Sequence, residues 1–289
     1  MHSNMAKKDL KKVELELRRY EREDKIKDKD LFEVVEEVFD RRTVLSVIEL
    51  KRRGCLKTLK GVVSAGKEAR VYWAIAPDGS DLAVKIYLTV TAEFRKSIWK
   101  YIKGDPRFEW IDKLPRRKLM AVWARKEYSN LKRLHRAGVL VPQPICYHDT
   151  IIVMKFIGER GKRAPLLKEL LDAGELDTEL AKYLLNRILE FVKIAYVKAK
   201  LIHADLSEYN VMVWQGEPYL IDVAQAVRID HPNALEFLRR DIHNIIRFFD
   251  EEVGIDVPDP DEILKEIVKE GSSGYPIGES EVEDLEHEP

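Results

Sequence analysis

LIHADLSEYN, residues 201–210, is the most informative stretch of this chain, together with Asp222, which follows twelve residues after Asn210. The spacing is His-x-Asp-x-x-x-x-Asn with a second acid downstream. Transfer of a phosphoryl group from ATP needs one carboxylate for the incoming hydroxyl and oxygen ligands for magnesium. Asp205, Asn210 and Asp222 fit those roles in that order. Because the same spacing also occurs in structural loops, its weight depends on what the rest of the chain supplies.

Length and composition are those of a globular protein. The chain has 289 residues, a formal net charge of −1 and 35% charged residues. No apolar run reaches the roughly 20 residues of a spanning helix, and the N-terminus lacks the apolar core of a signal peptide. We therefore expect a cytoplasmic protein. Cys55 and Cys146 are too few and too far apart to indicate a disulfide framework or a zinc cluster, and we expect buried apolar thiols.

The distribution of charge and glycine divides the chain into four parts. Lys7 to Asp30 is almost entirely charged, which is typical of a solvated helix or arm. Gly271 to Pro289 is rich in Gly, Ser and Glu and is expected to be disordered. Thr43 to Arg53 has the pattern of a short helix, with Gly54 just past its end. The parts that we expect are a charged arm and helical lead-in (1–60), an N-terminal lobe (61–157), a C-terminal lobe (158–270) and an acidic tail (271–289).

A glycine-containing loop precedes a hairpin in the N-terminal part. Gly61 to Glu68 reads Gly-Val-Val-Ser-Ala-Gly-Lys-Glu. It matches the P-loop of nucleoside triphosphatases except at its last residue, where the P-loop has Ser or Thr. A P-loop must open a helix, but Arg70 to Ile75 is β-branched and aromatic and is expected to be a strand. Pro77 to Ser80 contains turn residues, and Asp81 to Leu88 returns as a second strand. A loop above a hairpin is typical of kinases, so we favour a kinase-type loop over a P-loop.

Two charged residues occupy positions that the pattern marks as buried. Lys85 lies in the middle of an apolar strand, where a lone ammonium is costly without an opposite charge or a ligand phosphate. Glu127 falls on the apolar stripe of a helix that we expect from Pro115 to Gly138. The economical hypothesis is that the two side chains pair, an arrangement that holds a lysine against the phosphates of ATP. The alternative is that Glu127 leans to solvent at the edge of the stripe.

The segment that follows this helix has the features of a hinge. Thr150 to Gly158 is an apolar strand that runs into a glycine-containing link. Because hinge backbone groups can bond the adenine edge, we nominate Met154, Phe156 and Ile157 for nucleotide contact. A plain core strand at this place is compatible with that role.

A helix and a hairpin would support the catalytic segment. Asp177 to Lys200 has apolar residues along one helical face. Val211 to Val213 and Tyr219 to Ile221, joined by a turn that contains Gly and Pro, are expected to form a hairpin. The hairpin would bring Asn210 near Asp222, and their two oxygen ligands fit a magnesium site.

In these segments the chain resembles the RIO family of atypical protein kinases, and in particular its first subfamily. The resemblance covers roughly Thr43 to Lys269. Ala65 stands where the family commonly has Thr, and Ala224 and Ala226 stand where Ser or Gly is frequent. The matching segments are Ser64 to Tyr72, Leu201 to Asn210, Ile221 to Val227, Asp230 to Pro232 and the helix from Leu235 to Ile242.

The resemblance implies a fold and a set of site residues. The fold would be α+β, a two-lobed protein-kinase-like fold with a β-rich N-lobe and a helical C-lobe. It would lack an activation segment and peptide-docking helices and would carry an N-terminal helical extension. Lys85 would contact the phosphates of ATP, Glu127 would pair with it, and Asp205 would be the catalytic base. Asn210 and Asp222 would bind Mg²⁺, with Mn²⁺ as an alternative. The phosphate loop would contain Ser64, Gly66, Lys67 and Glu68.

The resemblance also implies an activity and a partner. We expect a serine/threonine protein kinase and ATPase that transfers the γ-phosphoryl group to protein Ser, or transiently to Asp222, during maturation of the small ribosomal subunit. Its partners would be the pre-ribosomal small subunit and the RNA of that particle. Thr89 to Leu114 interleaves basic residues with rings, which suits RNA binding, although packing explains the rings equally well. Ser97 is a candidate autophosphorylation site.

Two alternatives remain open. Small-molecule kinases of the aminoglycoside and choline type share the motif at 201–210, but they usually carry a longer helical substrate region. A non-enzymatic assembly factor would keep the fold and lose the site, yet the four residues that define the site are present. These are Lys85, Asp205, Asn210 and Asp222.

Overall fold

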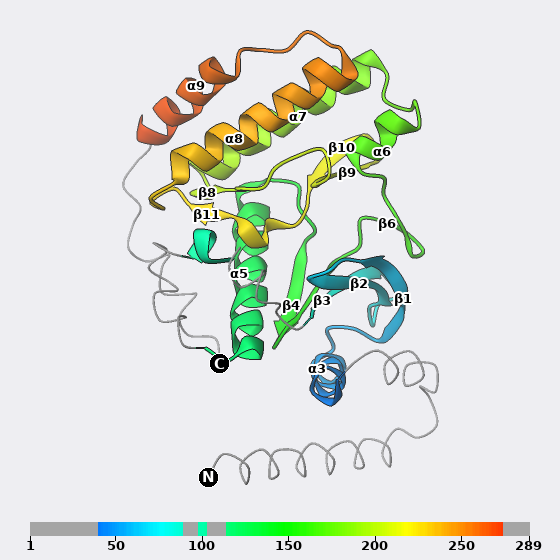
Figure 1. The fold of residues 1–289 in the computed structure, drawn as a ribbon. Coiled ribbons are helices and arrows are strands. Elements are labelled where there is room, and N and C mark those ends of the chain that lie inside the picture. Colours follow the sequence, from blue (N-terminus) through cyan, green and yellow to red (C-terminus); the bar gives the residue numbers. More distant parts are fainter. Residues whose placement is uncertain (1–39, 89–97, 103–113, 274–289) are drawn as a thin grey trace.

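The computed structural model describes residues 40–88, 98–102 and 114–273. An antiparallel sheet and a mainly helical part lie one above the other, and the long helix α5 runs alongside the sheet with one end at the helical part (Figure 1). The helices are α3 (Arg41–Arg52), α5 (Arg116–Ala137), α6 (Leu167–Asp172), α7 (Thr178–Val197), α8 (Ala234–Arg247) and α9 (Pro260–Ser273), with a 3-10 turn η3 (Val223–Gln225) and a π-helical segment η4 (Phe248–Val253). The strands are β1 (Thr58–Ala65), β2 (Ala69–Ile75), β3 (Asp81–Tyr87), β4 (Pro144–His148), β5 (Ile151–Lys155), β6 (Gly158–Glu159), β7 (Lys162–Arg163), β8 (Leu201–Ile202), β9 (Val211–Trp214), β10 (Glu217–Leu220) and β11 (Val227–Arg228).

The largest sheet has the strand order β1-β2-β3-β5-β4, and every neighbouring pair is antiparallel. Alternate side chains of its middle strand, β3, face opposite ways. Val84 and Ile86 belong to the apolar cluster that contains α3, whereas Ala83 and Tyr87 belong to the cluster that contains α5. Lys85 shares the second face, so it points toward α5 and the helical part.

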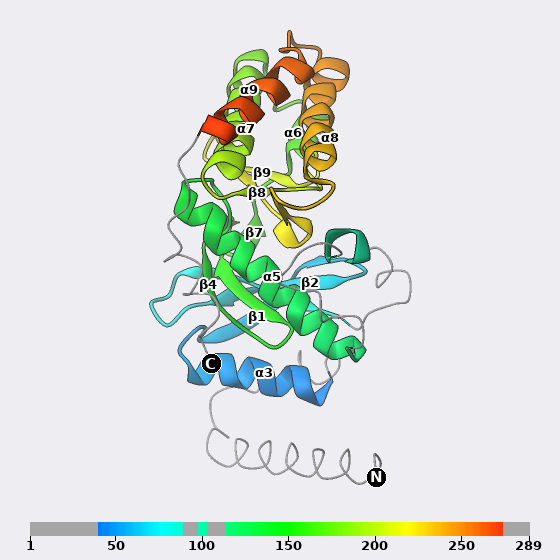
Figure 2. The ribbon, with the colours of Figure 1, turned by 90° about the vertical axis from the view of Figure 1, so that its left-hand side faces the viewer.

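Helix α3 covers the outer face of this sheet (Figure 2). Its first turn is capped by Asp40, whose Oδ1 accepts a hydrogen bond from the backbone nitrogen of Thr43 at 2.8 Å. The helix buries Val47 and Leu50 against the sheet. Gly54 follows it with φ of 72°, a left-handed conformation that favours glycine. The helix predicted at 43–53 is therefore confirmed.

Helix α7 forms the centre of the helical part. Asp177 caps it through a bond from Leu180 N at 2.8 Å, and its apolar face buries Leu184, Ile188 and Phe191. Helices α8 and α9 both pack on α7 (Figure 2). Within the described parts of the chain, no helix combines the length and the apolar character needed to cross a bilayer.

The described elements confirm the predicted α+β class and its main helices and strands. Helix α9 continues to Ser273, three residues into the segment for which disorder was expected, because its apolar face packs on α7 and α8. The four-part division of the chain stays a prediction. The charged stretch 7–30, Ser97 and most of the connection 89–114 lie outside the described residues.

The expectation of two buried free thiols is wrong. Cys55 and Cys146 form a disulfide, with their Cα atoms 6.3 Å apart and a sequence separation of 91. Both residues are only half-buried. Cys55 follows α3 and Cys146 lies in β4, and these two elements contact each other. The fold thus brings together two cysteines that are far apart in the sequence.

Candidate functional site

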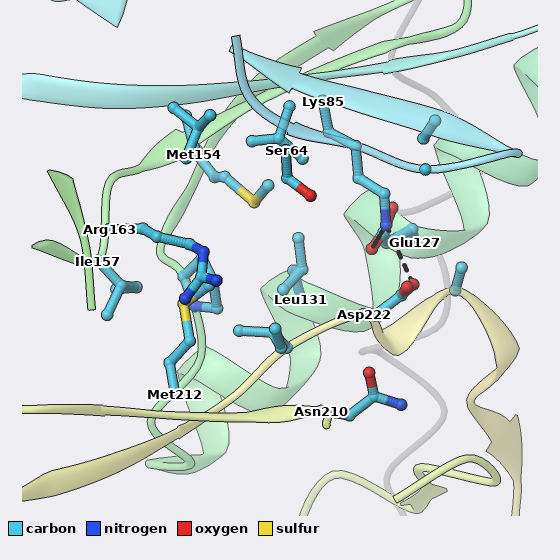
Figure 3. A pocket seen from close by; sticks show the side chains of 18 of the residues that line it. Ser64, Lys85, Glu127, Leu131, Met154, Ile157, Arg163, Asn210, Met212 and Asp222 are labelled. Carbon is cyan, nitrogen blue, oxygen red and sulfur yellow. Dashed lines mark hydrogen bonds and ion pairs between the residues drawn. The ribbon is translucent and has the colours of Figure 1, made fainter. Parts of the chain in front are cut away.

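A pocket of about 560 Å³ lies between the sheet and the helical part. Figure 3 shows that Arg163, Ile157 and Met212 lie at one end of it, and that Lys85 and Asp222 lie at the other. Every residue nominated for nucleotide contact from the sequence lines this pocket. These residues are Ser64, Gly66, Lys67, Glu68, Lys85, Glu127, Met154, Phe156, Ile157, Asn210 and Asp222.

The loop between β1 and β2 closes one wall of the pocket. The backbone nitrogen of Gly66 donates to Ala69 O at 3.0 Å. A Cβ atom at Gly66 would lie 3.2 Å from that same oxygen, so the tight turn favours glycine. Burial, together with the charge of Asp222, raises the pKa of Glu68. Strand β2 begins directly after this loop, so the loop opens a hairpin, and the preference for a kinase-type loop over a P-loop is confirmed.

Three charged side chains meet at the inner end of the pocket. Lys85 Nζ lies 2.7 Å from Glu127 Oε1 and 3.0 Å from Asp222 Oδ1 (Figure 3). Tyr87 donates its hydroxyl to the other oxygen of Glu127 at 2.5 Å. The side chain of Glu127 is 2% exposed, so it does not lean to solvent. Asp222 keeps 53% of its side chain exposed and faces the pocket.

These contacts fix the charge state of the cluster. The Lys85 ammonium holds the pKa of Asp222 below its usual value, although burial opposes this effect. Burial alone would lower the pKa of Lys85, but the carboxylates of Asp222 and Glu127 outweigh it and raise that pKa. Burial raises the pKa of Glu127, and its bond to Lys85 works against this rise. Lys85 and Asp222 are therefore both charged at neutral pH.

Asp205, on the segment between β8 and β9, does not line the pocket but contacts Asn210 and Gln225, which do. Its Oδ2 accepts from Gln225 Nε2 at 3.0 Å, and its backbone oxygen accepts from Asn210 Nδ2 at 2.7 Å. Burial first, and the charge of Asp222 second, raise the pKa of Asp205. Asn210 Nδ2 also reaches Oδ2, at 3.4 Å. A carboxylate with a raised pKa that is held by two side-chain amides is suited to receive a proton.

Helix α8 holds the backbone of the segment that carries Asp205. Asp241, 1% exposed, accepts from the backbone nitrogens of Ala204 at 2.7 Å and Leu206 at 3.0 Å. Arg240 donates to Ala204 O, and Asn244 donates to Leu206 O at 3.1 Å. Burial raises the pKa of Asp241 to about 7 against the effect of its two amide bonds. Ala204 has φ of 65°, and these contacts stabilise that uncommon conformation.

Asn210 and Asp222 form the candidate metal site. The backbone nitrogen of Ile221 donates to Asn210 O at 3.0 Å, because β9 and β10 pair as a hairpin. Asn210 Nδ2 is engaged with Asp205, which leaves the side-chain oxygen of Asn210 as a ligand atom. In the described ranges, no group of three or more His, Cys, Asp or Glu side chains is arranged to hold a metal. One carboxylate and one amide oxygen nevertheless fit Mg²⁺, which usually completes its shell with water and substrate phosphates.

Sequence reasoning missed Arg163, which lines the opposite end of the pocket. Its guanidinium bonds both oxygens of Glu169, at 2.7 and 2.6 Å, and donates to Ala164 O at 3.0 Å. Glu169 also accepts from Leu166 N at 2.9 Å at the start of α6. The side chain of Arg163 is therefore held in place while about a third of its surface stays exposed. No sequence signal pointed to it, because β6 and β7 are two residues each.

Comparison with known proteins agrees with this geometry. The RIO domain model matches residues 70–263. The chain is 42% identical over 234 residues to the Caenorhabditis elegans serine/threonine-protein kinase RIO1. The aligned region covers 81% of this chain and 45% of that protein. It is 39% identical to the Haloferax volcanii RIO-type serine/threonine-protein kinase Rio1, covering 78% of this chain and 74% of that protein. For the human serine/threonine-protein kinase RIO1 the identity is 41%, over 78% of this chain and 39% of the human protein.

The chain therefore belongs to the RIO family. It spans less than half of the length of the worm and human relatives. Among solved structures, the Rio2 kinase–ADP/Mg²⁺–phosphoaspartate complex from Chaetomium thermophilum matches with a TM-score of 0.58 and 22% identity, over 79% of this chain and 66% of that one. This likeness confirms the kinase-like fold.

Proposed function

We propose that this protein is an atypical serine/threonine protein kinase and ATPase of the RIO type. The observation that carries the proposal is the cluster of Lys85, Glu127 and Asp222, built on three separate elements at the inner end of one pocket. The named relatives are serine/threonine-protein kinases, which favours this activity over a small-molecule kinase. The pocket also retains the charged residues Lys85, Glu127 and Asp222, which a non-enzymatic assembly factor would not need.

The residues divide the work of phosphoryl transfer. Lys85, oriented by Glu127, would bond the phosphates of ATP, and the hydroxyl of the acceptor would give its proton to Asp205. Asn210 and Asp222 would hold Mg²⁺, or Mn²⁺ in its place, and the bound ion would neutralise phosphate charge. At the far end of the pocket, Met154, Phe156 and Ile157 would contact the adenine. Ser64, Gly66, Lys67 and Glu68 would close over the phosphates.

Asp222 has the properties of a phosphoryl acceptor as well as those of a ligand. Its pKa is lowered, its side chain is half exposed to the pocket, and only Oδ1 bonds Lys85. Attack of Oδ2 on the γ-phosphorus would form one P–O bond and break the bond to the β–γ bridging oxygen, and ADP would leave with that electron pair. Water would then release phosphate from the aspartyl phosphate. The Rio2 complex from Chaetomium thermophilum contains a phosphoaspartate, which supports this route.

Incubation with γ-³²P-labelled ATP and magnesium tests these two fates of the phosphoryl group. Label on Ser survives acid, whereas an aspartyl phosphate is released by hydroxylamine. We expect hydroxylamine-sensitive label on the wild type and none on Asp222→Ala, and loss of acid-stable label in Asp205→Ala. Absence of all label and of phosphate release in the wild type would contradict the proposal.

The partner that we propose is the pre-ribosomal small subunit, in the cytoplasm, contacted through its RNA. The support is the mixture of basic residues and rings at 89–114. One of those rings serves packing instead, because Tyr101 is 3% exposed and lies 5.6 Å from the Phe237 ring centre. Filter binding of the protein to small-subunit RNA, with Lys100→Glu as the variant and rising salt as a check, tests this partner. Equal binding by both proteins would contradict a role for this segment.

A further inference from the structure

Helix α5 carries a buried lysine one residue before Glu127. Lys126 is 1% exposed, and its Nζ donates to Ala224 O at 2.7 Å and to Ala226 O at 2.5 Å. The same ammonium lies 5.0 Å from the centre of the Trp123 ring. Burying an ammonium is costly unless polar groups replace its water. Backbone oxygens of one turn, η3 and the residue after it, do so here.

A second α5 side chain bonds the same turn. Asn130 is fully buried, and its Nδ2 donates to Val223 O at 2.9 Å and to Ala226 O at 3.3 Å. Residues four apart lie on the same face of a helix, so Lys126 and Asn130 reach the turn side by side. Together they bind the carbonyl oxygens of three of the four residues that follow Asp222.

The turn needs such support because of the backbone at its first residue. Asp222 has φ of 57° and ψ of 58°, a left-handed conformation that residues other than glycine adopt only when their surroundings impose it. In this conformation of the turn, its carboxylate lies 3.0 Å from Lys85. Glu127, on the same helix, holds Lys85 at 2.7 Å. Helix α5 therefore fixes both members of the Lys85–Asp222 pair.

We propose that Lys126 and Asn130 are positioning residues for phosphoryl transfer, which set the place of Asp222 relative to Lys85. Neither of them lines the pocket, so they act through Asp222 and not on the nucleotide. The proposal rests on the proposed function. It implies that α5 cannot move away from the catalytic centre without also releasing the turn that carries Asp222.

The test uses Lys126→Met and Asn130→Leu, which keep the size of each side chain and remove its donors. Lys118→Met is the matched control, since Lys118 is an exposed lysine on the same helix. We expect kcat to fall about a hundredfold in both variants, while the Kd of ATP without magnesium stays within about twofold. Amide hydrogen exchange of 222–227, measured without ligands, should rise about tenfold. The control should match the wild type.

Several outcomes would overturn the inference while the wild type remains active. If the variants have the kcat of the wild type and its rate of amide exchange at 222–227, the inference is wrong. It is also wrong if the variants lose nucleotide affinity by the same factor as they lose kcat. If Lys126→Met does not fold, Asn130→Leu decides, and if neither folds the contacts serve folding and the positioning role is wrong. A wild type that turns over no ATP refutes the proposed function, and the exchange measurement still decides whether these residues hold the turn.

Discussion

At the scale of single residues, the site depends on charges that are buried but paired. Lys85, 10% exposed, has both Glu127 and Asp222 within 3.0 Å. Removing one member of a buried pair costs more than the pair contributes, because the other charge is left without a partner. Under the proposed function, a change at this lysine affects both turnover and stability, and experiment can separate the two effects.

Lys85→Met should lower ATP turnover by about 10²–10³-fold, since a donor aimed at developing phosphate charge is lost. The same change should lower the free energy of unfolding by about 3–5 kcal/mol, because Glu127 remains buried and unpaired. Adding Glu127→Met should recover part of that stability without recovering turnover. Urea denaturation and steady-state kinetics measure the two quantities. Unchanged turnover in Lys85→Met would show that the cluster has no catalytic purpose.

Arg163→Met should raise the KM for ATP about fivefold and leave kcat unchanged, because a planar cation against a base contributes about 1 kcal/mol. Arg163 lies at the far end of the pocket from Asp222, away from the reacting atoms (Figure 3). Arg160→Met is the control, since Arg160 is 88% exposed and does not line the pocket. A fall in kcat with an unchanged KM would contradict a role in nucleotide binding.

At the scale of elements, two helices bind the backbone of the proposed catalytic site. Helix α8 binds the segment at 204–206 through Asp241, Arg240 and Asn244. Helix α5 binds the turn after Asp222 and also Lys85. The charged cluster of Lys85, Glu127 and Asp222 is complete with both helices in these positions.

Stability should depend on pH through Asp241. Its pKa in the fold is raised from 3.8 to about 7, mainly by burial, so the folded protein holds a proton that the unfolded chain has released. The stability gained from the proton held by Asp241 is fully present below about pH 4. It is lost as pH rises through about 7. Asp241→Asn does not titrate at this position. We expect the unfolding free energy of the wild type, relative to this variant, to fall between pH 4 and 7. Parallel pH profiles would contradict the assignment.

The sequence allowed parts of the site to be predicted, for a physical reason. Lys85 and Glu127 are charges on otherwise apolar strand and helix faces, and such positions demand partners. Asp241 shows the same signal on α8, but its partners are backbone amides of a distant segment, which no pattern of side chains reveals. Arg163 points into the pocket because of the short β6–β7 hairpin, which is too brief to leave a periodic signal. Contacts of these two kinds appear only once the chain is folded.

At the scale of the whole molecule, one covalent link joins helix α3 to the sheet. The Cys55–Cys146 disulfide connects the end of α3 to β4, across 91 positions of sequence. A crosslink of this span removes much conformational freedom from the unfolded chain. It lies on the α3 side of the sheet, with residues of the α3 cluster rather than with those that line the pocket.

Replacing both cysteines by serine should lower the free energy of unfolding by about 2–4 kcal/mol without changing kcat. Denaturation under non-reducing conditions measures the loss. The wild type treated with dithiothreitol serves as the control and should match the double variant. Equal stability of the oxidised wild type and the variant would show that the link contributes nothing.

The rate of magnesium-dependent phosphate release from ATP, compared between the wild type and Asp222→Asn, tests directly whether this pocket is a phosphoryl-transfer site. The substitution keeps the size of the side chain and removes the charge that pairs with Lys85, holds the metal and can accept the phosphoryl group. We expect release by the wild type and a rate at least about 10³-fold lower in the variant. Equal rates in the two proteins would contradict the assignment of this pocket as the centre of phosphoryl transfer.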